Sequence, residues 1–319
     1  TYVPQQELCE KVCAMLDVSS ELIYENLVEM AFEGEVQLDT LKGQTVVYLY
    51  AYYFAEQRVC RNIAGLVHAS LKSLSVDIDS MIKMTCGQTG ITLSEQQTEA
   101  VKSSLTGGVS VITGGPGTGK TTLINIFEQS GFKTAIAAPT GRAAKRITET
   151  SGHYASTVHR LLEYYHAADE DTMRFGKNSE DPLDYDVVIV DEASMIDLML
   201  MQGLTDALKE GTQLILVGDY DQLPSVGAGN VLRDLIESEY VHTVMLTEIF
   251  RQARESMIVV NAHRINQGEY PFLNGRDKDF FFMERSSEKQ IEELLVQLIT
   301  ARLPAYYAVS YTHLRAHET

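Results

Sequence analysis

The fold is decided by residues 109–122, whose sequence is VSVITGGPGTGKTT. The apolar run 109–113 predicts a buried strand, the glycines predict a tight turn, and a helical pattern follows from Thr121 to Ser130. The turn matches G-x-x-x-x-G-K-[ST] between a strand and a helix, which is the context that a phosphate-binding P-loop requires. The alternative is a glycine-rich turn that contains a lysine by chance. The strand and helix around the turn favour the P-loop.

A P-loop binds the phosphates of ATP through converging backbone N–H groups and the positive end of the following helix. Lys120 is expected to reach the β- and γ-phosphates, and the Thr121 hydroxyl is expected to bind Mg²⁺. ATP and Mg²⁺ are therefore the predicted cofactors. The residues expected to bind the nucleotide are Gly115, Pro116, Gly117, Thr118, Gly119, Lys120, Thr121 and Thr122.

Further short apolar segments alternate with helical patterns along residues 91–268. This alternation predicts an α/β fold, in which a parallel sheet is covered by helices on both faces and binds ligands at the carboxyl ends of its strands. The predicted strands are Val109–Thr113, Thr134–Ala138, Val187–Val190, Gln213–Val217 and Thr243–Leu246.

Two adjacent carboxylates, Asp191 and Glu192, follow the third of these strands. Beside a P-loop, Asp191 is expected to hold Mg²⁺ through a water and Glu192 to orient and deprotonate the attacking water. The alternative is a pair of acids that stabilise a helix N-terminus. The presence of the P-loop favours the catalytic interpretation.

Gln222 and Arg251 follow the last two predicted strands. A neutral amide is suited to sensing the γ-phosphate, and an arginine can neutralise charge that develops on the transferred phosphoryl group. Taken singly, each is more typical of a surface or capping residue. Their positions at successive strand ends favour a catalytic role.

The whole chain carries 26 basic and 44 acidic residues, a net charge of −18, which argues against binding nucleic acid by bulk charge. Locally the sign reverses. Residues 132–161 contain five basic residues and a single acid, Glu149. The basic residues are Lys133, Arg142, Lys145, Arg146 and Arg160. This segment is suited to phosphate contact, although a solvated helix face would have a similar composition.

Seven ordered motifs resemble the motor core of RecD-like superfamily 1 ATP-dependent DNA helicases, over residues 91–307. They are Leu93–Gln97, Gly114–Thr121, Ala138–Arg146, Ser156–Arg160, Asp191–Met195, Gly218–Pro224 and Leu246–Gln252. The resemblance implies a RecA-like domain that hydrolyses ATP to move 5′→3′ along single-stranded DNA and to unwind duplex junctions, in recombination or repair. It also implies that Gln97 reads adenine. The DNA contacts that it implies are Pro139, Thr140, Arg142, Lys145, Thr157 and His159.

Residues 1–90 are expected to form an accessory domain of winged-helix type, because helical patterns at Gln5–Leu16 and Ser20–Phe32 precede a predicted hairpin around Lys42–Gln44. A long helix, 50–74, should close it. A spacer and a DNA-contacting module are equally compatible with this outline. Residues 91–268 are expected to be the ATPase domain.

Residues 269–307 are expected to begin the connection to a second motor domain, and residues 308–319 to be a non-native tail. The sequence begins at Thr1 and includes no counterpart of the family's last two motifs. We therefore expect a fragment that on its own binds nucleotide weakly and unwinds little or no duplex. Within it, the family places a duplex-splitting hairpin near residues 164–186, where an ordinary loop is an equally good interpretation.

Two other functions remain open, namely a P-loop kinase or other NTPase, and a non-catalytic ATP- and DNA-binding module. The longest apolar or aromatic run, Val46–Ala55, is too short to span a bilayer. No membrane partner is expected, and the cytoplasm is the expected location. Any recombination or repair protein partners cannot be identified from the sequence.

Overall fold

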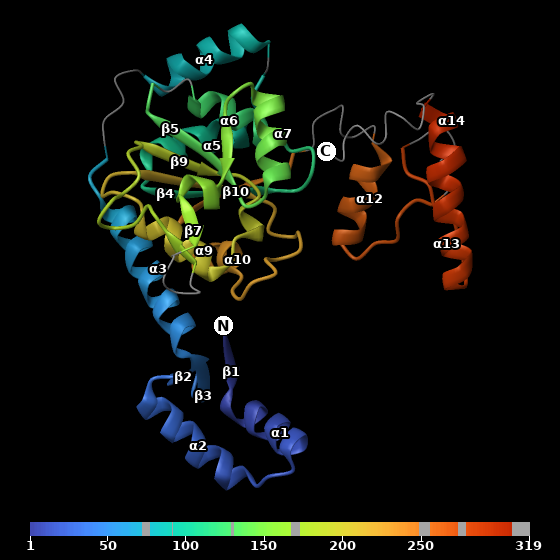
Figure 1. Cartoon of the computed structure of the whole chain (residues 1–319). Coiled ribbons are helices and arrows are strands. Elements are labelled where there is room, and N and C mark those ends of the chain that lie inside the picture. Colours follow the sequence, from blue (N-terminus) through green and yellow to red (C-terminus); the bar gives the residue numbers. More distant parts are fainter. Residues whose placement is uncertain are drawn as a thin grey trace. The chain divides into compact units, whose positions relative to one another are not determined.

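The computed structural model describes residues 1–71, 77–90, 92–128, 131–166, 173–248, 256–273 and 279–307. It divides the chain into two compact units, Thr1–Ala253 and Arg254–Thr319 (Figure 1). The first unit contains the predicted sheet and the helices around it.

Six parallel strands form the central sheet in the order β11-β4-β10-β9-β5-β6. This confirms the predicted parallel α/β fold. All five predicted strands lie in this sheet, and its sixth strand, β6, which is three residues long, was not predicted. The bounds are β4 Val109–Gly114, β5 Thr134–Ala138, β6 Ala155–Thr157, β9 Val187–Val190, β10 Gln213–Gly218 and β11 His242–Leu246.

Helices cover both faces of this sheet because alternate strand residues point to opposite sides. Val188 and Val190 pack into one core, and Val187 and Ile189 into the other. The first core is covered by α3 Tyr50–His68, α8 Val158–Leu161, α9 Leu198–Asp206 and α10 Val231–Glu237. The second is covered by α4 Ile78–Thr89, α5 Glu95–Thr106, α6 Lys120–Glu128 and α7 Gly141–Ser151.

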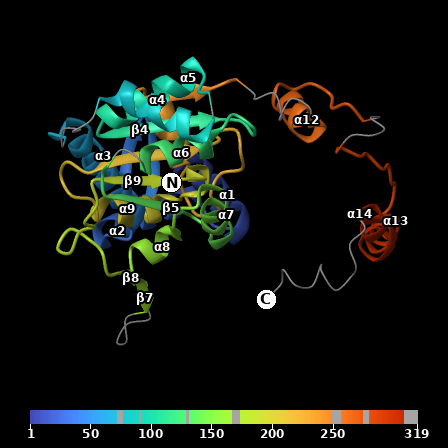
Figure 2. The same cartoon turned by 90° about the horizontal axis from the view of Figure 1, so that it is seen from above.

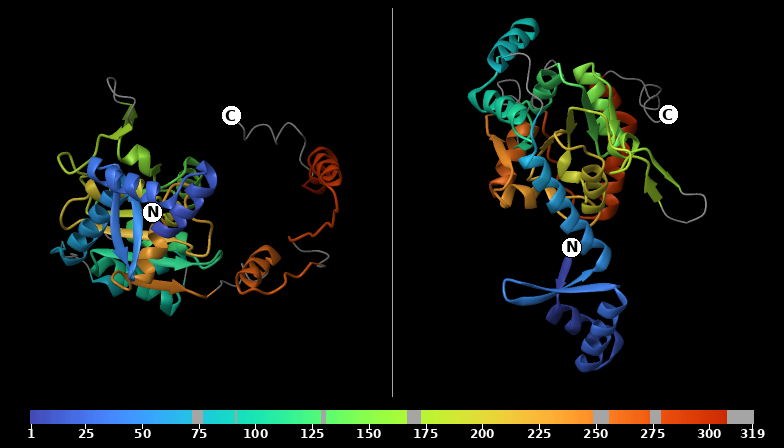
Figure 3. Two further views of the ribbon diagram at one scale, coloured as in Figure 1. Left: turned by 90° about the horizontal axis from the view of Figure 1, so that it is seen from below. Right: turned by 90° about the vertical axis from the view of Figure 1, so that its left-hand side faces the viewer.

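The N-terminal segment forms a small module of two helices on a three-stranded antiparallel sheet, visible in blue in the right panel of Figure 3. The predicted helices and hairpin are confirmed. Lys42 and Gly43 form the hairpin turn with φ of 50° and 80°, as a two-residue type I′ turn requires. The elements are β1 Tyr2–Pro4, α1 Gln5–Leu16, α2 Ser20–Glu33, β2 Val36–Leu41 and β3 Gln44–Leu49.

Helix α3 joins this module to the central sheet. It begins where β3 ends, and its residues Val59, Ile63 and Leu66 are buried in the first core. Arg58 and Asn62 bind Asp206 of α9, with both Arg58 Nε and Asn62 Nδ2 donating to Asp206 Oδ1, at 2.7 and 2.8 Å. The α3 helix therefore belongs structurally to the sheet as well as to the module.

A short hairpin leaves the body between α8 and β9. Strands β7 Tyr164–His166 and β8 Met173–Phe175 pair antiparallel, and Figure 2 shows them extending away from the sheet. Of the two interpretations of this region, the structure shows the hairpin. The Phe175 ring packs against Tyr164, with ring centroids 5.1 Å apart.

The second unit contains α12 Met257–Asn266, α13 Glu288–Gln297, a π-helical turn Leu298–Arg302 and α14 Leu303–Tyr307. Buried Asn261 accepts a hydrogen bond from the Phe272 N–H at 2.7 Å and donates one to its carbonyl at 3.0 Å. Residues 308–319 lie outside the described residues. Within the described residues, no helix has the length and apolar character needed to cross a membrane.

Candidate functional site

The P-loop connects β4 to α6 and has the backbone shape that phosphate binding needs. Gly117 and Gly119 have φ of 79° and 81°, a region that side chains with a Cβ disfavour. The Thr118 hydroxyl donates to the Gly115 carbonyl at 2.9 Å and closes the loop on itself. Gly114 lies so close to β11 that an added Cβ would sit 2.5 Å from the Leu246 carbonyl oxygen.

Lys120 is held against this loop by its own side chain. Its Nζ donates to the carbonyls of Gly114 and Gly115, the latter at 3.0 Å. Burial lowers the pKa of Lys120, while the nearby carboxylates of Asp219, Asp191 and Glu192 act in the opposite direction. The ammonium group is therefore surrounded by acids at the mouth of the P-loop.

Asp191 and Glu192 follow β9 and turn toward the P-loop. The Asp191 N–H continues the strand ladder to the Ala137 carbonyl at 2.9 Å, and the Asp191 side chain accepts from the Glu192 N–H at 2.9 Å. Burial raises the pKa of Asp191, which is 8% exposed. Glu192 has a left-handed φ of 54°, a strained conformation of the kind that concentrates at functional sites.

Gln222 completes the pocket from the end of β10, where its N–H donates to the Asp219 carbonyl at 3.1 Å. One cavity of about 270 Å³ gathers side chains from three neighbouring strand ends and from α7. Its predicted lining residues are Pro116, Gly117, Thr118, Gly119, Lys120, Asp191, Glu192 and Gln222.

The oxygen donors at this pocket fit Mg²⁺, which usually binds one or two carboxylates together with waters and phosphate. Asp191 and Glu192 supply such carboxylates. Among the described residues, no group of three or more His, Cys, Asp or Glu side chains could hold a metal by itself. The side chains of Thr121 and Thr122 lie outside the part of the chain that the structure describes, and so does Arg251.

Gln97 lies behind the P-loop, not in the pocket. It is almost fully buried, and its amide donates to the Thr118 carbonyl at 3.0 Å. The same amide accepts from the Ser94 N–H at 3.1 Å, as part of a capping box that begins α5. The geometry gives Gln97 a role in holding the P-loop, and adenine recognition stays a prediction.

Arg146 is a pocket residue that sequence reasoning missed. It was grouped with the basic segment assigned to DNA, but its guanidinium is 4.0 Å from Glu192 and it lines the pocket at the P-loop. Ala143, Ile147 and Thr150 line the same pocket. Their helical spacing of three and four residues was the available signal, because it places all four residues on one face of α7.

Gln96 is a second residue that was missed. Its amide donates to the Thr247 hydroxyl and accepts from the Thr247 N–H, both at 2.9 Å. Thr247 immediately follows β11, four residues before Arg251. The adjacent glutamines 96 and 97 thus tie the start of α5 to the end of β11 and to the P-loop.

The residues predicted to contact DNA gather at the carboxyl ends of the neighbouring strands β5 and β6, where Ala138 pairs with Thr157 and β6 is the edge strand of the sheet. Thr140 and Thr157 cap α7 and α8 through their hydroxyls. Arg142 and Lys145 are exposed on α7. Pro139 lies between β5 and the Thr140 cap, and the His159 ring packs on Tyr164 of the hairpin, with ring centroids 5.0 Å apart.

Residues 92–279 match the AAA domain family. The ATP-dependent RecD2 DNA helicase of Deinococcus radiodurans is 41% identical over 183 residues, which cover 56% of this chain and 24% of that protein. The RecBCD enzyme subunit RecD of Mycobacterium tuberculosis is 33% identical over 281 residues, covering 79% of this chain and 45% of that protein. A Pif1 helicase from Candida albicans superposes with a TM-score of 0.43 at 21% identity, covering 66% of this chain and 55% of that one.

This chain therefore spans less than half the length of either curated relative. The matched region includes the P-loop, the carboxylates after β9 and Gln222. Since it extends over more than half of the sequence, the chain belongs to the AAA domain family, and it is similar to RecD helicases.

Proposed function

We propose that this chain is the ATP-hydrolysing motor part of a DNA helicase that moves 5′→3′ along single-stranded DNA and unwinds duplex junctions. One observation carries the proposal: Lys120, Asp191, Glu192 and Gln222 come from three neighbouring strand ends and line one pocket. A P-loop, a buried aspartate, a glutamate and a neutral amide together are the set that ATP hydrolysis needs.

Each residue has a distinct role in this mechanism. Lys120 binds the β- and γ-phosphates, and Asp191 and the Thr121 hydroxyl hold Mg²⁺. Glu192 orients the attacking water and accepts its proton, while Gln222 senses the γ-phosphate. Arg251 neutralises charge on the transferred phosphoryl group. When bound by these residues, Mg²⁺ would supply positive charge that stabilises the developing negative charge.

Single-stranded DNA is proposed to lie along the carboxyl edge of β5 and β6. The support is the position of Thr140, Arg142, Lys145, Thr157 and His159 at these adjacent strand ends. Pro139 belongs to the same edge. Exposed cations and capping hydroxyls are the groups that usually contact the nucleic-acid backbone.

We also propose that residues 1–90 form an accessory domain and that residues 91–268 form the ATPase domain. Residues 269–307 are proposed to begin the connection to a second motor domain. A place in recombination or repair, with other protein subunits, is suggested by relatives named as RecBCD subunits. A cytoplasmic location accords with this role.

The test is Glu192→Gln in the full-length natural protein, with ATP hydrolysis measured in the presence and absence of single-stranded DNA. We expect turnover to fall about 100-fold or more, with nucleotide binding retained, because the general base is removed while the P-loop is intact. Glu239→Gln is the matched control, since Glu239 is exposed and has the same φ of 54°.

Three results would redirect the assignment. Undiminished turnover in Glu192→Gln would contradict the role of Glu192 as the base. Phosphate transfer to a small acceptor, with no stimulation by DNA, would favour the P-loop kinase. A wild-type protein that binds ATP and DNA without turnover would favour the non-catalytic module.

A further inference from the structure

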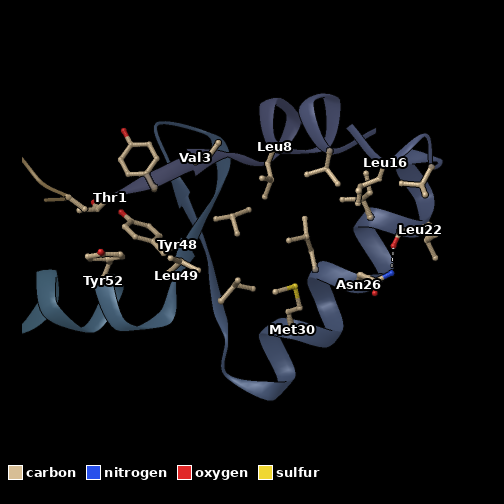
Figure 4. Close-up of a pocket in the computed structure, with 18 residues that line it drawn as sticks. Thr1, Val3, Leu8, Leu16, Leu22, Asn26, Met30, Tyr48, Leu49 and Tyr52 are labelled. Atoms are coloured by element: carbon tan, nitrogen blue, oxygen red, sulfur yellow. Dashed lines mark hydrogen bonds between the residues drawn. The ribbon is translucent and has the colours of Figure 1, made fainter. Parts of the chain in front are cut away.

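The N-terminal module contains an apolar groove of about 760 Å³ that the nucleotide site does not use (Figure 4). Helices α1 and α2 form two of its walls and the three-stranded sheet forms another, while Thr1, Val18, Tyr52 and Ala228 complete the lining. Its lining side chains are apolar apart from a few. One of these, Asn26, is satisfied because its amide donates to the Leu22 carbonyl at 2.7 Å.

The two helices present matching apolar stripes to the groove. Leu8, Val12 and Leu16 line it from α1, each four residues after the last, and Leu22, Asn26 and Met30 do so from α2. Such a stripe extends over about 12 Å, at 1.5 Å per residue. Leu16 and Leu22 remain 66% and 48% exposed. Two stripes of this length suit an amphipathic helix whose anchors repeat every three or four residues.

The charge around the groove determines which helix fits. Residues 1–49 contain nine acids and two bases, a net charge of −7, and Lys11 is already paired with Glu7 at 2.6 Å. Glu29 follows Leu22 by seven residues and Glu33 follows Asn26 by seven, so both acids lie in line with these lining residues, at the rim of the groove. This field repels nucleic acid and also a second copy of the same module.

We propose that this groove docks a basic amphipathic helix of a partner protein. Its apolar side chains enter between α1 and α2, and its Lys or Arg side chains face Glu29 and Glu33. The sequence left two roles open for the module, as a spacer or as a DNA contact. The geometry points instead to a protein-docking site.

The experiment uses a labelled 18-residue peptide with Leu at helical positions i, i+3, i+4 and i+7 and Lys elsewhere, titrated with the 319-residue chain by fluorescence anisotropy. Leu16→Glu should weaken binding about 10-fold or more, since it puts a charge in the apolar groove. Met15→Glu is the matched control, because Met15 is its neighbour, is 81% exposed and does not line the groove. It should change the affinity less than about twofold.

A second variant separates charge from apolar contact and does not depend on Leu16. The double change Glu29→Lys and Glu33→Lys should weaken binding of the Lys peptide. It should strengthen binding of a second peptide that has Glu in place of each Lys. Both acids are exposed, so the fold should persist, which circular dichroism checks.

Four results would overturn the proposal. In the first, a Lys peptide with scrambled Leu positions binds the chain as tightly as the peptide with Leu at helical spacing. A labelled single-stranded oligonucleotide binds the chain, and Leu16→Glu abolishes that binding, which assigns the groove to nucleic acid. The chain forms dimers that Leu16→Glu abolishes, which assigns the groove to a second copy. The full-length protein, unlike this chain, fails to bind the peptide, which assigns the groove to one of its own segments.

Discussion

At the scale of one residue, burial of the Asp191 carboxylate lowers the stability of the folded chain at neutral pH. Its carboxylate is nearly buried at the end of β9, and burial raises its pKa above 3.8. Between pH 3.8 and the raised pKa, the folded chain therefore holds this proton more than the unfolded chain does. The contribution of Asp191 to stability falls as the pH rises through that window, and at neutral pH the ionised group is destabilising.

We therefore expect Asp191→Asn to raise the free energy of unfolding by about 1 kcal/mol at pH 7. The amide oxygen can still accept from the Glu192 N–H, so the local turn should persist. Urea unfolding at pH 4 and pH 7 measures the effect, and Asp39→Asn in β2 is the control outside the site. Magnesium-dependent nucleotide binding should be lost at the same time. A variant less stable than the wild type would show that the charge of Asp191 is favourable in the folded chain.

At the scale of elements, two glycines within helices differ in their surroundings, since one lies on a packed helix surface and the other on a free one. Gly203 in α9 faces the Phe175 ring of β8, and an added Cβ would lie 2.4 Å from a ring carbon. Gly65 in α3 has nothing within 4 Å of such a Cβ. Gly203 therefore provides the surface of α9 on which Phe175 of the β7–β8 hairpin packs.

Gly65→Ala should stabilise the chain by about 0.5–1 kcal/mol, because alanine loses less entropy in a helix. Gly203→Ala should instead destabilise it by about 1–3 kcal/mol or displace Phe175. Thermal unfolding compares the two variants. If both variants gained stability, the hairpin would not be seated on α9.

At the scale of the first unit, α3 belongs to two structures at once. It closes the N-terminal module and also places Val59, Ile63 and Leu66 in the first core of the sheet. At its end, Leu66 lies so near Gly108 that a Cβ there would be 1.9 Å from the Leu66 carbonyl oxygen. Only glycine permits this approach, which brings α3 against the start of β4.

A chain shortened to residues 92–319, which keeps the matched region, should therefore expose part of this core. Each of the three large aliphatic residues contributes about 1.5–3 kcal/mol through burial. We expect the shortened chain to aggregate or unfold, while a chain that begins at residue 50 and keeps α3 should stay folded. Size-exclusion chromatography and circular dichroism distinguish these outcomes. A monomeric, folded 92–319 chain would show that α3 is dispensable.

Local sequence patterns determined the elements of this protein. Helix α1 matches its predicted range, and so do β5 and β9, because helical spacing and continuous apolar runs depend on neighbouring residues alone. Strand β6 was missed because three residues carry no period. The short apolar run 280–283 forms no strand in the structure, because such a run does not by itself supply a pairing partner.

The sequence by itself also determined the parallel α/β fold and predicted which residues line the pocket at the P-loop, because a P-loop requires particular residues at fixed spacing. Only the tertiary structure placed Arg146 in the nucleotide pocket, Gln97 behind the P-loop and Gln96 on Thr247. It alone revealed the groove between α1 and α2 and the double role of α3. These features join residues from different elements, so their contacts depend on how helices and strands pack and not on any local pattern.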